Sequence, residues 1–104
     1  MSRREKIEAM LADEPDDQFL RYSLASELIK EDEHERSLEL LRGLMSDETP
    51  LVAAFLMAAR HLVELDRIDE ARTALRNGIE EARRQGENHV ADEMSEFLDA
   101  LGRR

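Results

Sequence analysis

The three histidines of this sequence are the side chains best suited to acid–base or metal chemistry near neutral pH. His34 falls in a charged stretch, His61 in an apolar run and His89 at the start of a predicted helix. Nucleophilic catalysis needs a serine, threonine or cysteine within hydrogen-bond reach of such a base. The chain has no cysteine, and no serine stands in an obvious relation to a histidine. A catalytic triad is therefore unsupported.

Glu31 and His34 share the Glu-x-x-His spacing that supplies two metal ligands from one helix in di-iron bundles. Those sites need two copies of the motif and two further glutamates that face inward. The second copy is missing here, and we expect Glu31 and His34 to lie in a solvated turn. The sequence therefore predicts no metal site and no cofactor.

Clusters of acidic residues are another candidate for acid–base chemistry. The positions concerned are Glu80, Glu81, Asp92, Glu93 and Glu96. Nothing in the pattern places them in an apolar pocket that would raise a carboxyl pKa, so we expect them on polar helix faces. The sequence also lacks a glycine-rich phosphate-binding loop. We therefore predict that the chain is not an enzyme.

Composition limits the elements that could position any site. Of the 104 residues, 41% are hydrophobic and 38% charged, with four glycines and two prolines, which predicts one all-α domain. The formal net charge of −10 repels phosphate and anionic lipid, and no apolar stretch could span a membrane. We expect no nucleic-acid or membrane partner. The absence of cysteine favours a cytoplasmic location.

Capping residues and a charged interruption mark the first half of the helical pattern. Ser2 is expected to cap the first helix. Asp16 and Asp17 open a second helix that runs to about Lys30. The charged residues 31–36 interrupt the apolar spacing, so we expect a tight turn there before the third helix.

Helix start and stop residues also mark the second half of the helical pattern. Thr49 and Pro50 predict the start of the fourth helix, with the threonine as its cap and the proline in its first turn. A fifth helix is expected to begin near Ile68. Gly86 and Asn88 then predict a stop and the cap of a sixth helix.

Two stretches of the sequence match one another at a separation of 34 positions. Residues 65–78 read LDRIDEARTALRNG, and residues 31–44 read EDEHERSLELLRGL. Small and apolar residues also coincide at this shift: Leu24-Ala25 with Ala58-Ala59, Leu28 with Leu62, Ser37 with Ala71, and Leu41 with Leu75. A repeat of this length built of two helices resembles the tetratricopeptide repeat family.

The resemblance implies antiparallel helix hairpins stacked as a short right-handed superhelix. It divides the single domain into a half repeat (1–15), two repeats (16–49 and 50–83) and a closing helix (84–104). In the family, small residues let the two helices of a hairpin approach closely. The small residues at the matching positions are Ala25 with Ser37, and Ala59 with Ala71.

Some positions depart from the family pattern. The bulky residue that opens the first helix is Arg21 in one repeat and Phe55 in the other, so we expect looser packing around Arg21. Asp32 and Asp66 replace the usual glycine between the helices, and aspartate can still enter such turns. Gly78 replaces an alanine and, if exposed, is expected to weaken its helix by about 1 kcal/mol.

The first helices of successive repeats line a concave peptide-binding groove in this family, and the resemblance implies such a groove here. Arg60 stands as a lone guanidinium within an otherwise mostly apolar lining. The expected ligand is therefore a mostly apolar peptide or helix of a partner protein with one acidic group. The expected lining consists of Phe19, Tyr22, Ser26, Ile29, Leu56, Arg60 and Val63.

The same lining also fits a structural role. The sixth helix or a second copy of the chain would then cover it, and the chain would be a homodimer or a fragment of a longer repeat array. Self-association weakens on dilution, so the mass in solution as a function of concentration separates a homodimer from an adaptor with an open groove.

Overall fold

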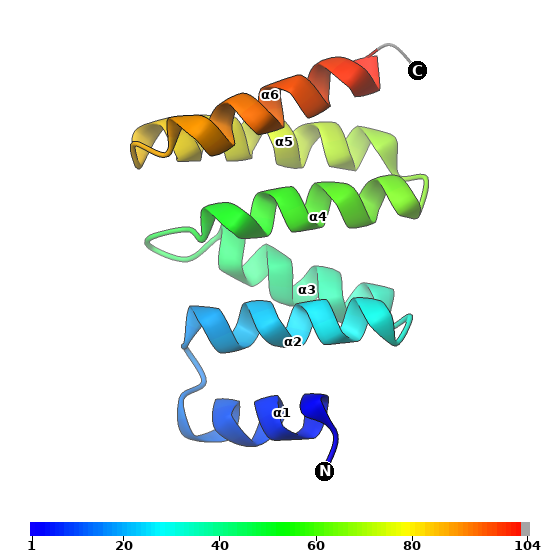
Figure 1. Cartoon of the computed structure of the whole chain (residues 1–104), viewed down its shortest axis with the longest axis vertical. Coiled ribbons are helices and arrows are strands. Elements are labelled where there is room, and N and C mark those ends of the chain that lie inside the picture. The colour runs from blue at the N-terminus through cyan, green and yellow to red at the C-terminus, as the bar shows by residue number, and fades with distance from the viewer. Residues whose placement is uncertain (103–104) are drawn as a thin grey trace. The chain divides into compact units, whose positions relative to one another are not determined.

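Six α-helices and no strand make up residues 1–102, the part of the chain that the computed structural model describes. Successive helices run in opposite directions within each hairpin (Figure 1). The prediction of an all-α fold of helix hairpins is confirmed. The helices are α1 (Arg3–Asp13), α2 (Gln18–Lys30), α3 (His34–Met45), α4 (Val52–Glu64), α5 (Ile68–Arg84) and α6 (Asn88–Gly102).

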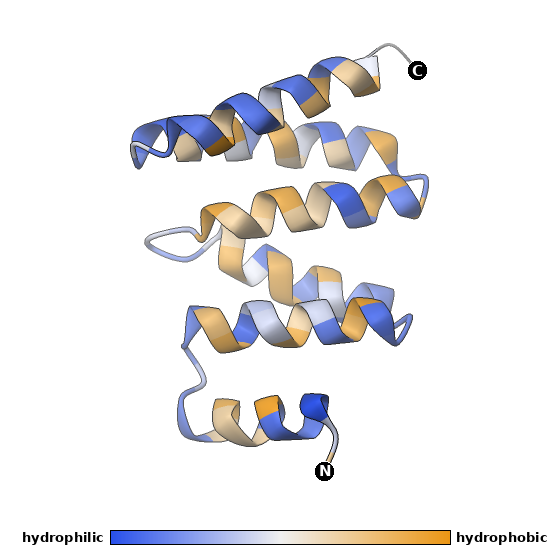
Figure 2. Ribbon diagram, in the orientation of Figure 1, coloured by the Kyte–Doolittle hydropathy of each residue, from blue (hydrophilic) through white to orange (hydrophobic). Residues whose placement is uncertain are grey.

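The helices form two compact units. The first unit, residues 1–51, contains α1, α2 and α3, and α2 packs against both of its neighbours in sequence. The second unit begins at residue 52, and in it α5 packs between α4 and α6. Figure 2 shows that α4 is apolar along most of its length. Even so, no helix in residues 1–102 has the length and apolarity needed to cross a bilayer.

Side-chain caps begin the first two helices as predicted. The Ser2 hydroxyl accepts a hydrogen bond from the Glu5 amide, and the Glu5 carboxylate accepts one from the Ser2 amide, each at 3.1 Å. This reciprocal capping box satisfies two amide groups that helical hydrogen bonds leave unpaired. The bonds also hold the pKa of Glu5 below its ordinary value. Asp17 caps α2 by accepting from the Leu20 amide at 2.8 Å.

Left-handed aspartates end α2 and α4, as predicted from their place between the helices of each hairpin. Asp32 has a φ of 61° and Asp66 a φ of 59°. The amide after each aspartate donates to a carbonyl five residues earlier, Glu33 to Leu28 at 2.9 Å and Arg67 to Leu62 at 2.8 Å. This is the Schellman arrangement that usually takes glycine. Aspartate tolerates the left-handed region better than most side chains, so the turns keep their shape without glycine.

The predicted starts of the later helices were partly wrong. α3 begins at His34, so the turn is shorter than residues 31–36. α4 begins at Val52, so Thr49 is not its cap. Other bonds hold this segment: the Thr49 carbonyl accepts from the Gln18 side chain at 2.8 Å, and the Leu51 amide donates to α3 at 3.1 Å. Asn88 is the first residue of α6, not the cap that precedes it.

Small residues bring the two helices of each hairpin into contact. Ala25 and Ser37 are fully buried in the first unit, and the Ser37 hydroxyl donates to the Ala25 carbonyl at 2.9 Å. Ala59 and Ala71 are fully buried at the matching positions of the second unit. The predicted role of these positions is confirmed, and Ser37 adds a hydrogen bond between helices that alanine cannot make.

Gly78 is buried at the place where α4, α5 and α6 meet, so the weakening that was expected of an exposed glycine does not apply. A Cβ atom at this position would lie 2.6 Å from the Phe55 Cβ and 2.7 Å from the Met94 sulfur. Real Cβ atoms do not approach other atoms so closely. Glycine therefore permits the contact of Phe55 and Met94 with α5.

Arg21 is the residue of the first unit that corresponds to Phe55, and an ion pair fixes its side chain. Its guanidinium donates to both Asp47 carboxylate oxygens, at 2.7 and 3.2 Å, and only 15% of the Arg21 side chain is exposed. Gln18 donates to the same carboxylate at 2.9 Å. Gly43 leaves room for the guanidinium, because its Cβ would lie 3.0 Å from the Arg21 Nη2. The looser packing expected around Arg21 is replaced by a bidentate ion pair.

Replacement of Gly78 by alanine should destabilise the protein although alanine is the better helix former. Helix propensity would add about 1 kcal/mol of stability. The new Cβ meets the Phe55 Cβ, which cannot rotate away, and overpacking of this kind costs about 1 to 3 kcal/mol. We expect a net loss of about 1 kcal/mol in urea unfolding. Asn77→Ala, on the exposed neighbour, is the control and should be neutral or stabilising; a stabilised Gly78→Ala would contradict the packing.

Asp47 should contribute to stability in a pH-dependent way. The hydrogen bonds from Arg21, and then those from Gln18, hold the pKa of its carboxyl below its ordinary value. A depressed folded-state pKa stabilises the protein above the unfolded value of about 4. That stabilisation is lost as the pH falls through the folded-state pKa.

The variant Asp47→Asn should therefore be less stable than the native chain at pH 7. The difference in unfolding free energy should narrow as the pH falls below about 4, because the native carboxyl then becomes protonated. Urea unfolding across this pH range measures it, with the exposed Glu48→Gln as the control. A difference that stays constant with pH would contradict the ion pair.

Candidate functional site

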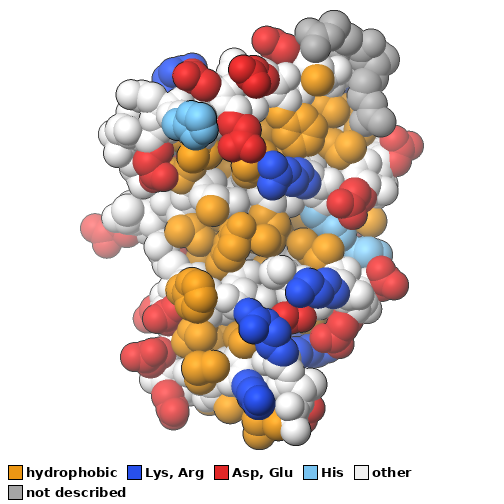
Figure 3. Space-filling model, in the orientation of Figure 1, with side chains coloured by type: hydrophobic (Ala, Val, Ile, Leu, Met, Phe, Trp, Pro, Cys, Tyr) orange, Lys and Arg blue, Asp and Glu red, His pale blue; other side chains and the backbone are white. Residues whose placement is uncertain are grey.

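One exposed side of α2 carries the first half of the predicted groove. Phe19 is 73% exposed, whereas Tyr22, Ser26 and Ile29 are half-buried. These four residues, called the α2 stripe below, recur at steps of three and four and therefore share one face of the helix. The opposite face carries buried leucines of the first unit's core. Figure 3 shows apolar side chains at the surface, beside basic and acidic ones.

The second half of the predicted groove lies on α4. Leu56 and Val63 are half-buried and Arg60 is exposed, and these three residues form the α4 stripe. The Arg60 guanidinium lies 3.3 Å from the Glu93 carboxylate on α6, so it is not the lone charge that was expected. No local sequence pattern signals this pair, because its members are far apart in the chain and on different helices.

The histidines and acidic clusters do not assemble into a metal site in the described residues. Glu31 ends α2 and His34 begins α3. No group of three or more His, Asp and Glu side chains within residues 1–102 could hold a metal ion. Glu80 is exposed as expected.

Glu81 differs from its expected place on a polar face, because it is buried. Gln85 and Arg84 donate hydrogen bonds to its carboxylate. These bonds lower the pKa of Glu81, Gln85 contributing most. A general acid needs the opposite shift, so this direction gives no support for Glu81 as a general acid.

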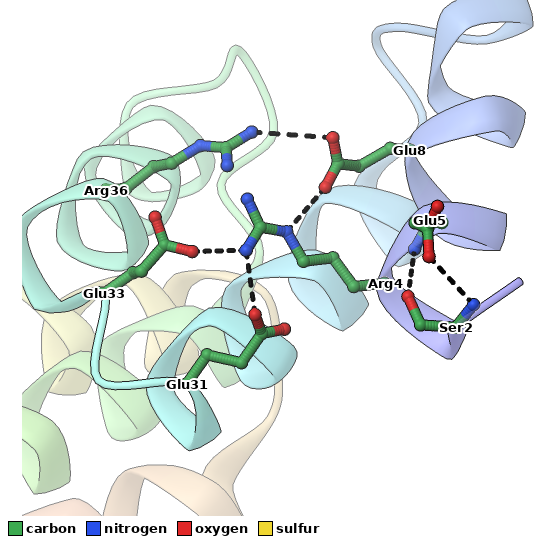
Figure 4. A network of polar contacts seen from close by, with 7 residues as sticks. All are labelled: Ser2, Arg4, Glu5, Glu8, Glu31, Glu33 and Arg36. Carbon is green, nitrogen blue, oxygen red and sulfur yellow. Dashed lines mark hydrogen bonds and ion pairs between the residues drawn. The ribbon is translucent and has the colours of Figure 1, made fainter.

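Arg4 is the centre of a polar cluster that the sequence analysis did not predict (Figure 4). Its guanidinium donates to Glu8 at 2.6 Å, to Glu31 at 2.9 Å and to Glu33. The bond to Glu8, followed by that to Glu31, raises the pKa of Arg4 above its already high ordinary value. The spacing of Arg4 and Glu8 signals one of these pairs. The other partners come from the end of α2 and the following turn, which only the fold brings close.

A hollow of about 300 Å³ lies between α2 and α3 in the first unit. Two of its lining residues belong to α2 and four to α3, and they combine two guanidinium groups with an apolar floor. We call it the α2–α3 hollow; its lining is Arg21, Leu24, Arg36, Glu39, Leu40 and Gly43.

Solved structures similar to this chain include proteins from Bordetella parapertussis and Salinibacter ruber. Protein BPP2914 from Bordetella parapertussis is 28% identical, with a TM-score of 0.81 and coverage of 99% of this chain and 90% of that one. A crystal structure of a tetratricopeptide repeat domain protein from Salinibacter ruber is 30% identical, with a TM-score of 0.73 and coverage of 84% and 97%.

A solution structure of a tetratricopeptide repeat domain protein from Salinibacter ruber is 31% identical and has a TM-score of 0.78. The match covers 84% of this chain and 88% of that chain. No protein-family model and no curated protein sequence matches the chain. The structural likeness, the identity over most of both chains and the 34-residue period agree, and the chain belongs to the tetratricopeptide repeat family.

Proposed function

We propose that this protein is an interaction module and that the α2 stripe and the α4 stripe each contact mostly apolar segments of a partner protein. Membership of a repeat family whose members offer extended binding surfaces supports the general role. The exposure of Phe19 supports the more specific one most directly. Phe19 is 73% exposed, so most of its apolar surface stays in contact with water unless a partner covers it. Removing that surface from water would favour binding.

The α2 stripe supplies the apolar part of the proposed contact. Phe19 and Tyr22 are three residues apart on one face, so a single ligand segment can touch both. Aromatic side chains of this kind dominate binding energy when a partner desolvates them. Ser26 and Ile29 extend the surface by two further turns.

The α4 stripe supplies a charge that a ligand can use. The side chains of Arg60 and Glu93 are 59% and 49% exposed, and exposed pairs of this kind stabilise a protein by less than about 1 kcal/mol. An acidic group of a ligand can therefore replace Glu93 at modest cost. The net charge of −10 disfavours strongly acidic ligands, so one carboxylate within an apolar segment is the favoured chemistry.

Substitutions in the two stripes should weaken binding without unfolding the protein. Peptides selected from a random displayed library on the native chain supply ligands, and calorimetry measures their affinity. Arg60→Glu should weaken them by about 2 kcal/mol, since it replaces a charge-assisted contact with repulsion. Tyr22→Ala should cost about 1 kcal/mol. Arg76→Glu, an exposed charge reversal on α5, should have no effect. Peptides indifferent to both stripe variants would contradict the proposal.

Removal of the competing carboxylate should strengthen the same ligands. Glu93→Gln leaves Arg60 without its internal partner, so peptides with one acidic residue should bind about two- to fivefold more tightly. Glu96→Gln, about one turn further along α6, is the matched control. The gain should vanish for peptides in which the acidic residue is replaced by its amide. An equal gain for those peptides would show that Arg60 does not receive the ligand's carboxylate.

Self-association is the alternative use of the same stripes. Sedimentation or light scattering over a wide range of concentrations distinguishes it, since a dimer dissociates on dilution. A dimer that becomes a monomer in Phe19→Ser would place the stripe in a homodimer interface and overturn the adaptor role.

A further inference from the structure

α1 is held to the first unit by a small apolar contact. Ile7 is its one buried side chain, and Leu11 is half-buried against the same cluster. Met10 remains 49% exposed. By comparison, α2 buries five residues. Segments with few buried apolar contacts open at the lowest cost in free energy, so α1 is the element of this unit most easily detached.

Ion pairs also connect α1 to the rest of the first unit. Arg3 pairs with Glu27 at 2.6 Å, and Arg4 bonds to Glu31 at 2.9 Å and to Glu33. Figure 4 shows the Arg4 guanidinium between carboxylates of α1, of the end of α2 and of the turn before α3. Most of these side chains are partly exposed, so dissolved salt screens their attraction.

The surface beneath α1 has a chemical pattern of its own. Leu24 and Leu28 form its apolar centre together with the half-buried Leu40. Three carboxylates lie at the end where α1 begins: Glu27, Glu31 and Glu33. Departure of α1 would leave both the leucines and these carboxylates without partners from α1.

α1 covers only part of this surface. The α2–α3 hollow shares Leu24 and Leu40 with it, yet no residue of α1 lines the hollow. Since α1 runs antiparallel to α2, a helix that continued beyond Asp13 in the same direction would move away from Glu31 and towards Arg21. The hollow therefore prolongs the surface that α1 occupies.

Arg36 gives the hollow a positive charge that can bind an anionic group of a ligand. The Arg36 guanidinium forms an ion pair with Glu8 of α1 at 3.8 Å, and departure of α1 would break this pair. Its N–H donors would then be available to a carboxylate of the partner helix. Glu39 at the rim disfavours a dianion, so a single carboxylate is the fitting anion.

We propose that the α2–α3 surface beneath α1 is a second docking site, at which an amphipathic helix of a partner protein replaces α1. The basic residues in the first turn of such a helix form ion pairs with Glu27, Glu31 and Glu33. Apolar residues four positions apart follow them and pack against Leu24, Leu28 and Leu40. It is longer than the 11 residues of α1 and bears a carboxylate that reaches Arg36 in the hollow. This site lies on the face of α2 opposite the α2 stripe, so it is independent of the function proposed above.

The first test is whether the ion pairs of Arg4 hold α1 in place. Arg4→Glu in the full chain should raise hydrogen exchange of the α1 amides by at least about tenfold, while α5 stays unchanged. Arg42→Glu, an exposed charge reversal on α3, is the control. Arg4→Gln should show a smaller rise and replaces Arg4→Glu if that variant fails to fold. Exchange in α1 as slow as in the native chain would overturn the proposal.

The second test offers the surface a helix in trans. A fluorescent peptide with the sequence of residues 1–14 should bind the Arg4→Glu chain at least about tenfold more tightly than the native or Arg42→Glu chain, because α1 competes less. The same peptide carrying Arg4→Glu should not bind. Equal binding to all three chains, or none to any, would overturn the proposal even if α1 exchanges rapidly.

A longer peptide tests the part played by the hollow. It carries one further turn, Ala-Leu-Ala-Glu, after residue 14. We expect it to bind the Arg4→Glu chain several-fold more tightly than the shorter peptide, and Arg36→Ala added to that chain should abolish the gain. Arg42→Ala in the same background should leave it unchanged. Equal affinity of the two peptides would contradict the proposal that the partner helix is longer than α1. It would indicate instead that copies of this chain exchange α1.

Discussion

Close approach of helices at positions with little or no side chain is the constraint on which both units depend. Gly78 lets Phe55 of α4 and Met94 of α6 meet α5, and Ser37 lies close enough to Ala25 to bond its carbonyl. Backbones this close leave no space for a larger residue between them. The longer side chains are consequently placed on the remaining faces, where they fill the core or remain exposed.

As a result of this constraint, the two faces of α2 have different roles. One face carries the leucines that pack within the first unit, and the other carries the α2 stripe with its exposed Phe19. A helix packed in this way can present a binding surface without weakening its own core. The same helix ends in carboxylates that bond to Arg4, so its last turn also fixes α1.

The sequence predicted those features that depend on residues close together in the chain or on the repeat. Ser2 and Asp17 cap helices because their partners are three residues away, and Asp32 and Asp66 take the turn position that the 34-residue period assigns to them. The alanines and Ser37 followed from the same period. Local geometry is enough to determine such features.

Contacts between distant residues were the ones missed. The burial of Gly78 was not predicted, because its neighbours Phe55 and Met94 come from other helices. Thr49 failed as a cap because bonds from elsewhere in the first unit hold its segment. Phe19 and Arg60 are exposed, but the pairing of Arg60 with Glu93 depends on how α6 packs, and no local pattern encodes that.

Arg21 and Phe55 occupy the same position of the repeat, as do Asp47 and Glu81, and both pairs of positions are 34 residues apart. Arg21 binds Asp47, whereas Phe55 has no charge to offer and Glu81 bonds within its own helix to Arg84 and Gln85. The acidic residue therefore pairs with the opening residue only where that residue is an arginine. The two repeats are not interchangeable modules: an array lengthened by copying one of them must copy this opening residue and its acidic counterpart together.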